Sequence, residues 1–384
     1  VPNLRFPEFT EEWERCSLGH VTDFVKERIS TDKLTLANYV STENMKSDFG
    51  GINPAISIPN NTNVIHYKKG DVLLSNIRPY LRKVWAANSD GGCSTDVFVF
   101  RAKSISPSFL HYIMANDTFI NYVMSGAKGV KMPRGDKEQM LKYVFSIPRI
   151  EEQYKISRLL HLLDDRIATQ NKIIEKYESL IQAIIYQKKM DGIREGNWQK
   201  TELSKVLQER TEKNINGYTV CSVSVSQGVI NQIEYLGRSF AAKETSHYNI
   251  VKYGDIVYTK SPTGDFPYGI VKRSYIKNAV AVSPLYGVYK PINDNIGVFL
   301  HFYFMQSNNA FNYLHPLIQK GAKNTINITN ARFLENSIPL PKTEDEVVYI
   351  ANALTSIQTK IDLEKSLLCS YEKEKQYLLR QMFI

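Results

Sequence analysis

The chain has 384 residues, with 48 lysines and arginines against 39 aspartates and glutamates, which gives a formal net charge of +9. Its hydrophobic share of 43% and charged share of 23% are typical of a folded globular protein and exclude a largely disordered one. No apolar run approaches the roughly 20 residues that a membrane helix needs, and residues 1–7 lack the pattern of a signal peptide. The four cysteines lie far apart, so we expect no disulfide framework, no cysteine-based zinc site and a cytoplasmic location.

The sequence repeats itself once. The segment 13–21 matches 198–206 in the spacing of its Trp, Leu and Val residues. Four further pairs of segments match in the same order: 69–73 with 253–257, 109–112 with 299–302, 126–128 with 321–323, and 146–148 with 337–339. The offsets between the matches all lie between 184 and 195 residues, which indicates a duplicated unit. A period this long predicts a tandem pair of domains and not a solenoid.

The first part of each unit, residues 1–149 and 191–341, is predicted to mix strands with short helices. Gly70-Asp71 and Gly254-Asp255 are turn dipeptides, and each one precedes a β-type run. The predicted strands are 72–75 and 95–100 in the first unit and 256–259 and 285–289 in the second, and the predicted helices are 107–124 and 297–314. His111 and His301 take equivalent places on these apolar helices, so we interpret them as core histidines.

Each unit ends in a long helix, predicted over 150–190 and 342–384 and therefore about 60 Å long. Apolar residues recur at alternating steps of four and three, and the seam that starts at Ile156 reappears 194 residues later, starting at Ile350. The polar seam residues Gln170 and Glu364 coincide in this register. Asp191-Gly192 is expected to end the first helix.

Two matched heptad helices in one chain predict that they pair with each other as an antiparallel coiled coil. This pairing would hold the two globular parts at a fixed distance and relate them by a pseudo-twofold axis. A core helix or a dimerisation stalk is the alternative. The predicted fold class is α+β, with two tandem mixed α/β domains separated by two long helices and an internal repeat.

No catalytic constellation is visible in the sequence. It contains neither a phosphate-binding loop of the Gly-x-x-x-x-Gly-Lys-Ser/Thr kind nor a His-Glu-x-x-His motif. Asn53-Pro54-Ala55 is the nearest approach to the Asn/Asp-Pro-Pro-aromatic motif of amino-methyltransferases, and it fails. The histidines are scattered, and we find no metal-ligand cluster. We therefore expect a binding or scaffolding protein with no catalytic and no metal-binding residues.

The basic residues gather in loops of the globular parts, together with Asn, Gln and Gly. Lys and Arg bind phosphates, Arg and Lys also pair with guanine, and Asn or Gln pairs with adenine. Segments 126–131 and 321–326 share the frame Gly-Ala-Lys and then diverge, as expected for two readers of unlike DNA sequences. A solvated basic loop is the alternative. The candidate DNA-contacting residues are Asn76, Arg78, Arg82, Lys128, Lys131 and Arg134 in the first domain, and Lys260, Thr263, Lys320, Lys323, Asn324 and Asn327 in the second.

The whole chain resembles the specificity subunit of a Type I restriction–modification enzyme. The order domain, helix, domain, helix carries this resemblance. It is supported by Trp13 and Trp198 at the starts of the units and by the runs 70–79, 148–156 and 162–167.

The resemblance implies two target-recognition domains, each reading one half of a bipartite, asymmetric site in double-stranded DNA, with the helices as spacer. It also implies two methyltransferase subunits docked on this scaffold, and restriction subunits that translocate and cleave DNA. S-adenosylmethionine, ATP and Mg²⁺ are expected on those partners and no cofactor on this chain. The rival interpretations are a coiled-coil structural or adhesive protein with duplicated binding domains, and a free-standing nuclease or methyltransferase.

Overall fold

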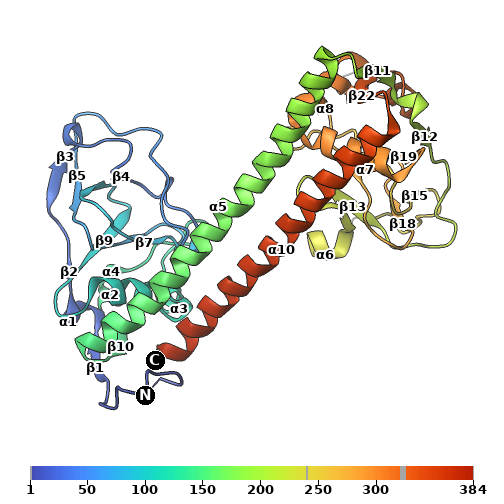
Figure 1. Ribbon diagram of the computed structural model, residues 1–384. Helices are drawn as coiled ribbons and strands as arrows, with labels where there is room; N and C mark the ends of the chain where they lie inside the picture. The colour runs from blue at the N-terminus through green and yellow to red at the C-terminus, as the bar shows by residue number, and fades with distance from the viewer. Residues whose placement is uncertain (1, 239–240, 321–325, 384) are drawn as a thin grey trace. The chain divides into compact units, whose positions relative to one another are not determined.

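The computed structural model in Figure 1 describes residues 2–238, 241–320 and 326–383. The chain divides into two compact units. Unit 1 comprises Val1–Gln170 and Leu367–Ile384, and unit 2 comprises Asn171–Ser366. Each unit therefore holds one globular domain and a part of both long helices. None of the helices in the described part of the chain is both long and apolar enough to cross a bilayer.

Domain 1, the globular part of unit 1, is built on two four-stranded sheets, ordered β2-β9-β6-β7 and β3-β5-β8-β4. The strands are β1 (Glu14–Ser17), β2 (Thr22–Phe24), β3 (Arg28–Ser30), β4 (Tyr39–Val40), β5 (Asn63–Tyr67), β6 (Val72–Ser75), β7 (Val84–Ala86), β8 (Gly91–Cys93), β9 (Val97–Ala102) and β10 (Val144–Ile147). The helices are α1 (Leu18–Val21), α2 (Pro107–Met114), α3 (Asp117–Ser125) and α4 (Lys137–Leu141), with short 3-10 turns at Thr31–Lys33 and Pro79–Leu81. One apolar core joins the first sheet to α2 and α3, and a second core lies between the two sheets.

Domain 2, the globular part of unit 2, contains the four-stranded sheet β12-β19-β16-β17. Its strands are β11 (Trp198–Glu202), β12 (Leu207–Glu209), β13 (Cys221–Ser224), β14 (Gly228–Asn231), β15 (Asn249–Val251), β16 (Ile256–Tyr258), β17 (Val271–Arg273), β18 (Val280–Val282), β19 (Gly287–Pro291), β20 (Gln319–Lys320), β21 (Ile326–Asn327) and β22 (Ser337–Pro341). Its helices are α6 (Gln232–Leu236), α7 (Asp294–Met305), α8 (Ser307–Leu314) and α9 (Asn330–Phe333), with 3-10 turns at Leu203–Lys205 and His315–Leu317.

The internal repeat is confirmed by the strand order. The sheet β2-β9-β6-β7 of domain 1 has the same antiparallel order as β12-β19-β16-β17 of domain 2. In both domains the first strand pairs antiparallel with the last, as β1 with β10 and β11 with β22. The predicted strand 72–75 is β6, and the predicted strand 256–259 is β16 without its last residue.

The Gly-Asp turns that precede these two strands are built alike. Gly70 and Gly254 have φ values of +90° and +89°, in the left-handed region that favours glycine. The Asp71 carboxylate accepts two hydrogen bonds from Arg101, of 2.9 and 2.8 Å, and the Lys68 N–H also donates to it. Asp255 is held in the same way by Arg210 and by the Lys252 N–H. Each dipeptide is thus both a turn and a buried anchor for its sheet.

The helices predicted over 107–124 and 297–314 are each interrupted. In domain 1 the chain leaves α2 at Ala115, and Asn116 starts α3 by accepting a 3.0 Å hydrogen bond from the Thr118 N–H. In domain 2 the extended backbone of Gln306 separates α7 from α8. An asparagine side chain that caps a new helix competes with continuation of the old one, and apolar spacing alone does not reveal this.

The long helices are α5 (Ile150–Arg194) and α10 (Glu344–Met382). The prediction that Asp191-Gly192 ends the first helix is wrong, because α5 continues to Arg194 and domain 2 begins after it. The reason lies in packing. A Cβ atom on Gly192 would lie 1.9 Å from Cδ1 of Trp198, so the glycine makes room for the buried indole inside an unbroken helix.

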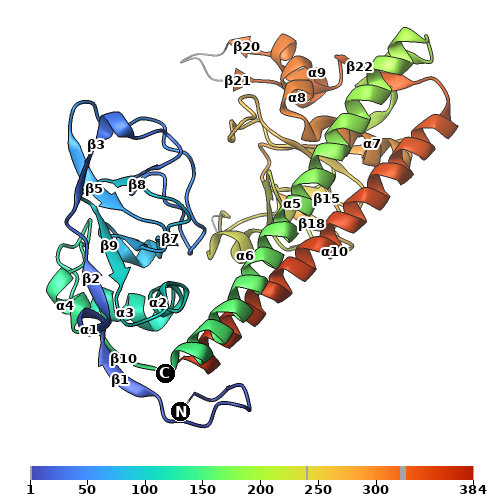
Figure 2. The ribbon, with the colours of Figure 1, turned by 60° about the vertical axis from the view of Figure 1, so that its left-hand side comes forward.

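The two helices pair antiparallel in each unit, as predicted (Figures 1 and 2). In unit 1, Asp164 contacts Lys375 at 2.5 Å, and the Arg166 Nε donates to the Tyr371 hydroxyl. In unit 2, Glu178 contacts Lys365 at 2.7 Å, and Lys188 lies over the ring of Tyr349. The seam between the helices is mostly apolar and buried, with Gln170 as a buried polar member. Its buried members include Ile156, Leu160, Ile174, Ile181, Ile350, Leu354 and Ile361.

Candidate nucleic-acid interface

The structure brings together the two basic segments predicted for domain 1. The Arg78 N–H donates to the Pro133 carbonyl at 2.8 Å, and the Gly135 N–H donates to the Asn76 carbonyl at 3.1 Å. An isolated antiparallel bridge also links Ile77 to Arg134. The loop that follows β6 and the segment 128–134 therefore form one surface, which we call the domain 1 interface.

Segment 128–134 is a closed turn with an exposed tip. The Lys128 N–H donates to the Arg134 carbonyl and the Arg134 N–H to the Lys128 carbonyl, both at 2.9 Å. Gly129 has a φ of +96°, which the turn needs and which L side chains rarely adopt. Val130 is fully exposed at the tip, and Lys131 beside it is exposed as well. The main-chain hydrogen bonds thus present a cation and an apolar side chain to solvent.

Three of the predicted cations are already paired within domain 1. Lys128 Nζ lies 2.8 Å from Asp136, and Arg134 Nη1 lies 2.8 Å from Asp96. Arg82 donates to Asp117 and to Asp48, both at 2.9 Å, and it adopts a φ of +54°. The hydrogen bonds that Arg82 and Lys128 donate to these carboxylates raise the pKa of both residues, so both side chains stay charged. Lys131 has no hydrogen bond or ion pair with any residue in the described ranges.

Such pairs need not prevent DNA binding. The Lys128 side chain is 81% exposed and that of Arg134 is 53% exposed. Ion pairs at exposed positions contribute about 0–1 kcal/mol, so a phosphate can compete with the carboxylate for the cation. Before DNA binds, the carboxylates hold the lysine and arginine side chains in place, which reduces the conformational entropy lost on binding.

Asn76 and Arg78 lie deeper than the other candidates. Asn76 is only 9% exposed, and its Oδ1 has no hydrogen-bond partner among the described residues. Arg78 has a left-handed backbone with a φ of +51°, and its Nε is buried without a partner. The main chain of both residues ties the loop to segment 128–135. Their positions favour support of the interface, and their contact with bases stays a prediction.

Domain 2 places its own candidates around the loop that follows β16. Lys260 lies at the start of this loop with a φ of +59°, and its Nζ donates to Asn330 Oδ1 at 2.5 Å. Asn330 in turn donates to Glu209 at 2.7 Å. Burial lowers the pKa of Lys260. Thr263 is exposed further along the loop, where its N–H donates to the Phe266 carbonyl at 3.0 Å.

Of the remaining candidates of domain 2, Lys320 and Asn327 lie on the hairpin strands β20 and β21, in which Lys320 opposes Ile326. Lys323 and Asn324 lie outside the described residues, as do the side chains of Lys320 and Asn327. The hairpin leads directly into α9, whose first residue Asn330 contacts Lys260. In the described part of domain 2, the loop after β16 therefore lies beside the start of α9.

Sequence reasoning missed the acidic partners of these cations. Asp136 could have been recognised, because an aspartate before Lys-Glu-Gln is a common helix start, and it caps α4 through the N–H groups of Glu138 and Gln139. Asp48 and Asp96 come from distant loops and carry no local signal. The Asp48-Phe49 turn is held by Leu81 and Arg82, since its two N–H groups donate to their carbonyls at 3.0 and 2.9 Å.

The model of one protein family, described as the Type I restriction modification DNA specificity domain, matches the chain twice, over residues 10–179 and 200–370. The chain belongs to this family. Each match covers one globular domain and most of the long helix that follows it. The resemblance predicted from the sequence is therefore confirmed, and the structural or adhesive alternative is not favoured.

Individual relatives agree with the family. The EcoDI Type I restriction enzyme specificity subunit of Escherichia coli is 30% identical over 120 residues, which cover 30% of this chain and 27% of that protein. The crystal structure of a Type I restriction–modification S subunit from M. genitalium is 12% identical, with a TM-score of 0.63 over 100% of this chain and 99% of the other. A structure described for complex assembly and conformational transition of the Type I restriction–modification system is 17% identical, with a TM-score of 0.53 over 96% of both chains. At these identities the solved structures show a shared fold.

Proposed function

We propose that this chain is the DNA sequence-recognition subunit of a Type I restriction–modification complex. Each domain of this specificity-family chain reads one half of a bipartite, asymmetric duplex site. The observation that carries the proposal is that two domains with the same sheet order carry loops of different sequence after the equivalent strands β6 and β16. A shared frame with divergent loops is what two readers of unlike half-sites require.

The domain 1 interface has the chemistry that duplex DNA recognition needs. Exposed Lys128, Lys131 and Arg134 can neutralise phosphates, and an arginine can also donate two hydrogen bonds to a guanine. The exposed side chain of Val130 suits contact with the methyl group of thymine. The main-chain hydrogen bonds across the turn fix its shape before binding, so that little ordering is required when DNA arrives.

The partners of the chain follow from the same proposal. Two methyltransferase subunits dock on the scaffold and bring S-adenosylmethionine, and they flip the target adenine out of the duplex to methylate it. Restriction subunits bring ATP and Mg²⁺ for translocation and cleavage. This chain supplies recognition and no catalytic residue. The complex acts on DNA inside the cell, so we place it in the cytoplasm.

The test exchanges residues 128–134 for an unrelated loop of equal length and maps methylated adenines with the methyltransferase partner present. We expect the first half of the recognised site to change or to become degenerate, while the second half stays the same. An exchange of the exposed segment 56–61 serves as a matched control. An unchanged first half-site would show that segment 128–134 does not read bases.

Two further outcomes would favour the rival interpretations. Modification of DNA by the purified chain alone, given Mg²⁺ or S-adenosylmethionine, would indicate a free-standing nuclease or methyltransferase. A lack of salt-dependent duplex binding in the presence of a methyltransferase partner would indicate a structural protein, since phosphate contacts always release counterions.

A further inference from the structure

Unit 2 contains a cavity that is separate from the candidate DNA-contacting residues. Its volume is about 670 Å³, and it lies between β14, β17, α7 and the two long helices. Lys272, His301, Phe302, Gln227, Gln182 and Gln358 are among the residues that line it. Cavities of about 300–1,000 Å³ with mostly apolar walls and a few polar groups are typical of small-molecule sites.

Lys272 stands out in this wall. The residue is only 5% exposed, yet no described residue accepts a hydrogen bond from its ammonium group or forms an ion pair with it. Burying an unpaired charge is unfavourable, and proteins normally avoid it or pair it. Burial accordingly lowers the pKa of Lys272 to about 8. A buried cation without a counter-ion that borders a cavity indicates a site for an anion.

The other charged groups of the wall are already engaged. Glu178 pairs with Lys365 at 2.7 Å, and Asp362 accepts a hydrogen bond from Gln358 at 2.9 Å. Neither acid forms an ion pair with Lys272.

Two residues next to Lys272, Arg273 and His301, determine which hydrogen-bonding groups the cavity wall presents. Arg273 has its guanidinium over the rings of Tyr253 and Tyr275, at 4.7 and 4.5 Å from their centroids, and it pairs with Asp294. His301 Nδ1 accepts a 3.2 Å hydrogen bond from the Arg273 N–H, and burial lowers the pKa of this imidazole to about 3. The neutral ring therefore carries its proton on Nε2 and is a hydrogen-bond donor.

Domain 1 shows that the fold does not require a cation at this position. In domain 2, Lys272 pairs with Val257 across β17 and β16. The equivalent register position in domain 1 pairs Leu73 with Trp85 across β7 and β6. Trp85 packs edge-on against Tyr67 at 5.8 Å. Where domain 1 has an aromatic side chain, domain 2 keeps a lysine and a cavity.

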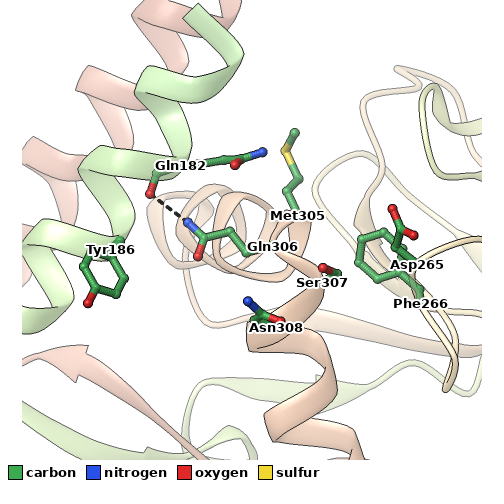
Figure 3. A pocket seen from close by; sticks show the side chains of 8 residues that line it. All are labelled: Gln182, Tyr186, Asp265, Phe266, Met305, Gln306, Ser307 and Asn308. Carbon is green, nitrogen blue, oxygen red and sulfur yellow. Dashed lines mark hydrogen bonds between the residues drawn. The ribbon is translucent and has the colours of Figure 1, made fainter. Parts of the chain in front are cut away.

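A second hollow, of about 360 Å³, adjoins this cavity and shares Gln182, Met305 and Gln306 with it. Figure 3 shows Gln306 donating a 2.9 Å hydrogen bond to the Gln182 carbonyl of α5, from the break between α7 and α8. Gln182 and Gln306 thus line both hollows, and the side-chain amides of Gln227 and Gln358 border the main cavity as well.

We propose that the cavity binds a small organic anion, a phosphate or carboxylate group on an aromatic or apolar body, with Lys272 as its counter-ion. The imidazole of His301 and the amides of Gln182, Gln227 and Gln358 supply hydrogen bonds, and Phe302 with Ile181 supplies apolar contact. This site is additional to the proposed recognition of DNA and does not depend on it.

The test titrates the full chain with two anions and their neutral counterparts, adenosine 5′-monophosphate with adenosine and benzoate with benzamide. We expect calorimetry to detect binding of at least one anion and a much weaker response to its neutral counterpart. A response to the phosphate or to the carboxylate identifies the group that the site prefers. Absence of binding by both anions at millimolar concentration, or equal binding of the neutral counterparts, would overturn the proposal.

Variants assign the binding to the cavity. Lys272→Met should weaken binding of the anion by at least about 10-fold, while Lys272→Arg keeps the charge and should retain it. Lys277→Met removes an exposed lysine two residues beyond Tyr275 and should leave the affinity unchanged. Loss of binding in the arginine variant as well, or full binding in the methionine variant, would contradict a counter-ion role. Circular dichroism shows whether each variant is folded.

Discussion

At the scale of single residues, the domain 1 interface separates cations that are paired from one that is free to bind. Lys128 and Arg134 each contact a carboxylate at 2.8 Å, whereas Lys131 at the tip forms no hydrogen bond or ion pair with a described residue. A phosphate that binds Lys128 must replace Asp136, and a phosphate that binds Lys131 replaces only water. Lys128 and Lys131 carry equal charges in the same turn, but we therefore expect them to contribute different free energies to DNA binding.

We predict that Lys131→Ala weakens duplex binding by ~3- to 10-fold and lowers the salt slope by about 1. Lys128→Ala should weaken binding less, because its phosphate contact is offset by the ion pair that it gives up. The measurement is duplex binding at several salt concentrations. Lys103→Ala, at the opposite end of β9 and paired with Asp23 at 3.6 Å, is the control. A larger effect of Lys128→Ala than of Lys131→Ala would contradict this ranking.

The buried histidines lead to a prediction about pH. Burial lowers the pKa of His111 to about 4 and that of His301 to about 3, against roughly 6.5 in the unfolded chain. The unfolded state then binds more protons, so stability falls as the pH drops below about 6.5. We expect each histidine to remove about 2 kcal/mol of stability near pH 5 relative to neutral pH.

Chemical denaturation near pH 5 and near pH 7.5 measures this loss. The double variant His111→Gln, His301→Gln should show a much flatter pH dependence over the same window. Equal stability of the unaltered chain at both pH values would show that the imidazoles are not buried as neutral groups.

At the scale of secondary-structure elements, the sequence predicts what periodicity and turn chemistry encode. The strand 72–75 and the pairing of the long helices follow from alternation, from Gly-Asp turns and from a heptad seam. The break at Asn116 and the continuation of α5 past Gly192 depend instead on a capping side chain and on an indole packed against a glycine. Competing local hydrogen bonds and tertiary packing determine where such helices end. The spacing of apolar residues in the sequence does not reveal either effect.

The end of α5 gives a prediction that is the opposite of what helix propensity alone suggests. Alanine normally favours a helix interior over glycine by about 1 kcal/mol. At Gly192 the new Cβ would overlap Trp198, so we predict that Gly192→Ala destabilises the chain by about 1–3 kcal/mol. Tryptophan fluorescence during denaturation measures the change.

Ser179→Ala, on an exposed position of the same helix, is the control and should be neutral or slightly stabilising. A stabilising Gly192→Ala would mean that Trp198 moves aside at little cost, and that the glycine is not needed for its packing.

The candidate DNA-contacting residues likewise divide into those that a local sequence pattern reveals and those whose surroundings depend on residues far away in the chain. The frame Gly-Ala-Lys, repeated in both domains, is enough to single out segment 128–134 and its counterpart. The neighbours of segment 128–134 come from elsewhere in the chain, since Arg78 lies beside Pro133. The prediction includes Asn76 among the DNA-contacting residues, and only the packing of two loops shows that it is buried.

At the scale of the whole molecule, the net charge of +9 is divided between two domains that each carry candidate DNA-contacting residues. Every phosphate that a cation neutralises releases counterions, and these releases add when the sites are independent. The two domains belong to different compact units, so we expect their electrostatic contributions to duplex binding to be additive.

We predict that replacing Lys128, Lys131 and Arg134 by Gln lowers the slope of log affinity against log salt by about 2–3. Replacing Lys320 and Lys323 by Gln should lower it by about 2, and the combined variant should show the sum. Duplex binding between about 50 and about 200 mM salt measures the slopes. A combined effect well below the sum would show that the two domains do not bind one duplex together.

The pairing of the first and last strands of each domain has a consequence for how such chains diversify. β1 lies against β10 and β11 against β22, so each domain enters and leaves its unit at adjacent points. A segment whose ends meet can be exchanged by recombination without moving the elements that flank it. On the proposed function, the two strand pairs would make each domain an exchangeable segment, so that one genetic event could change one half-site and leave the long helices unchanged.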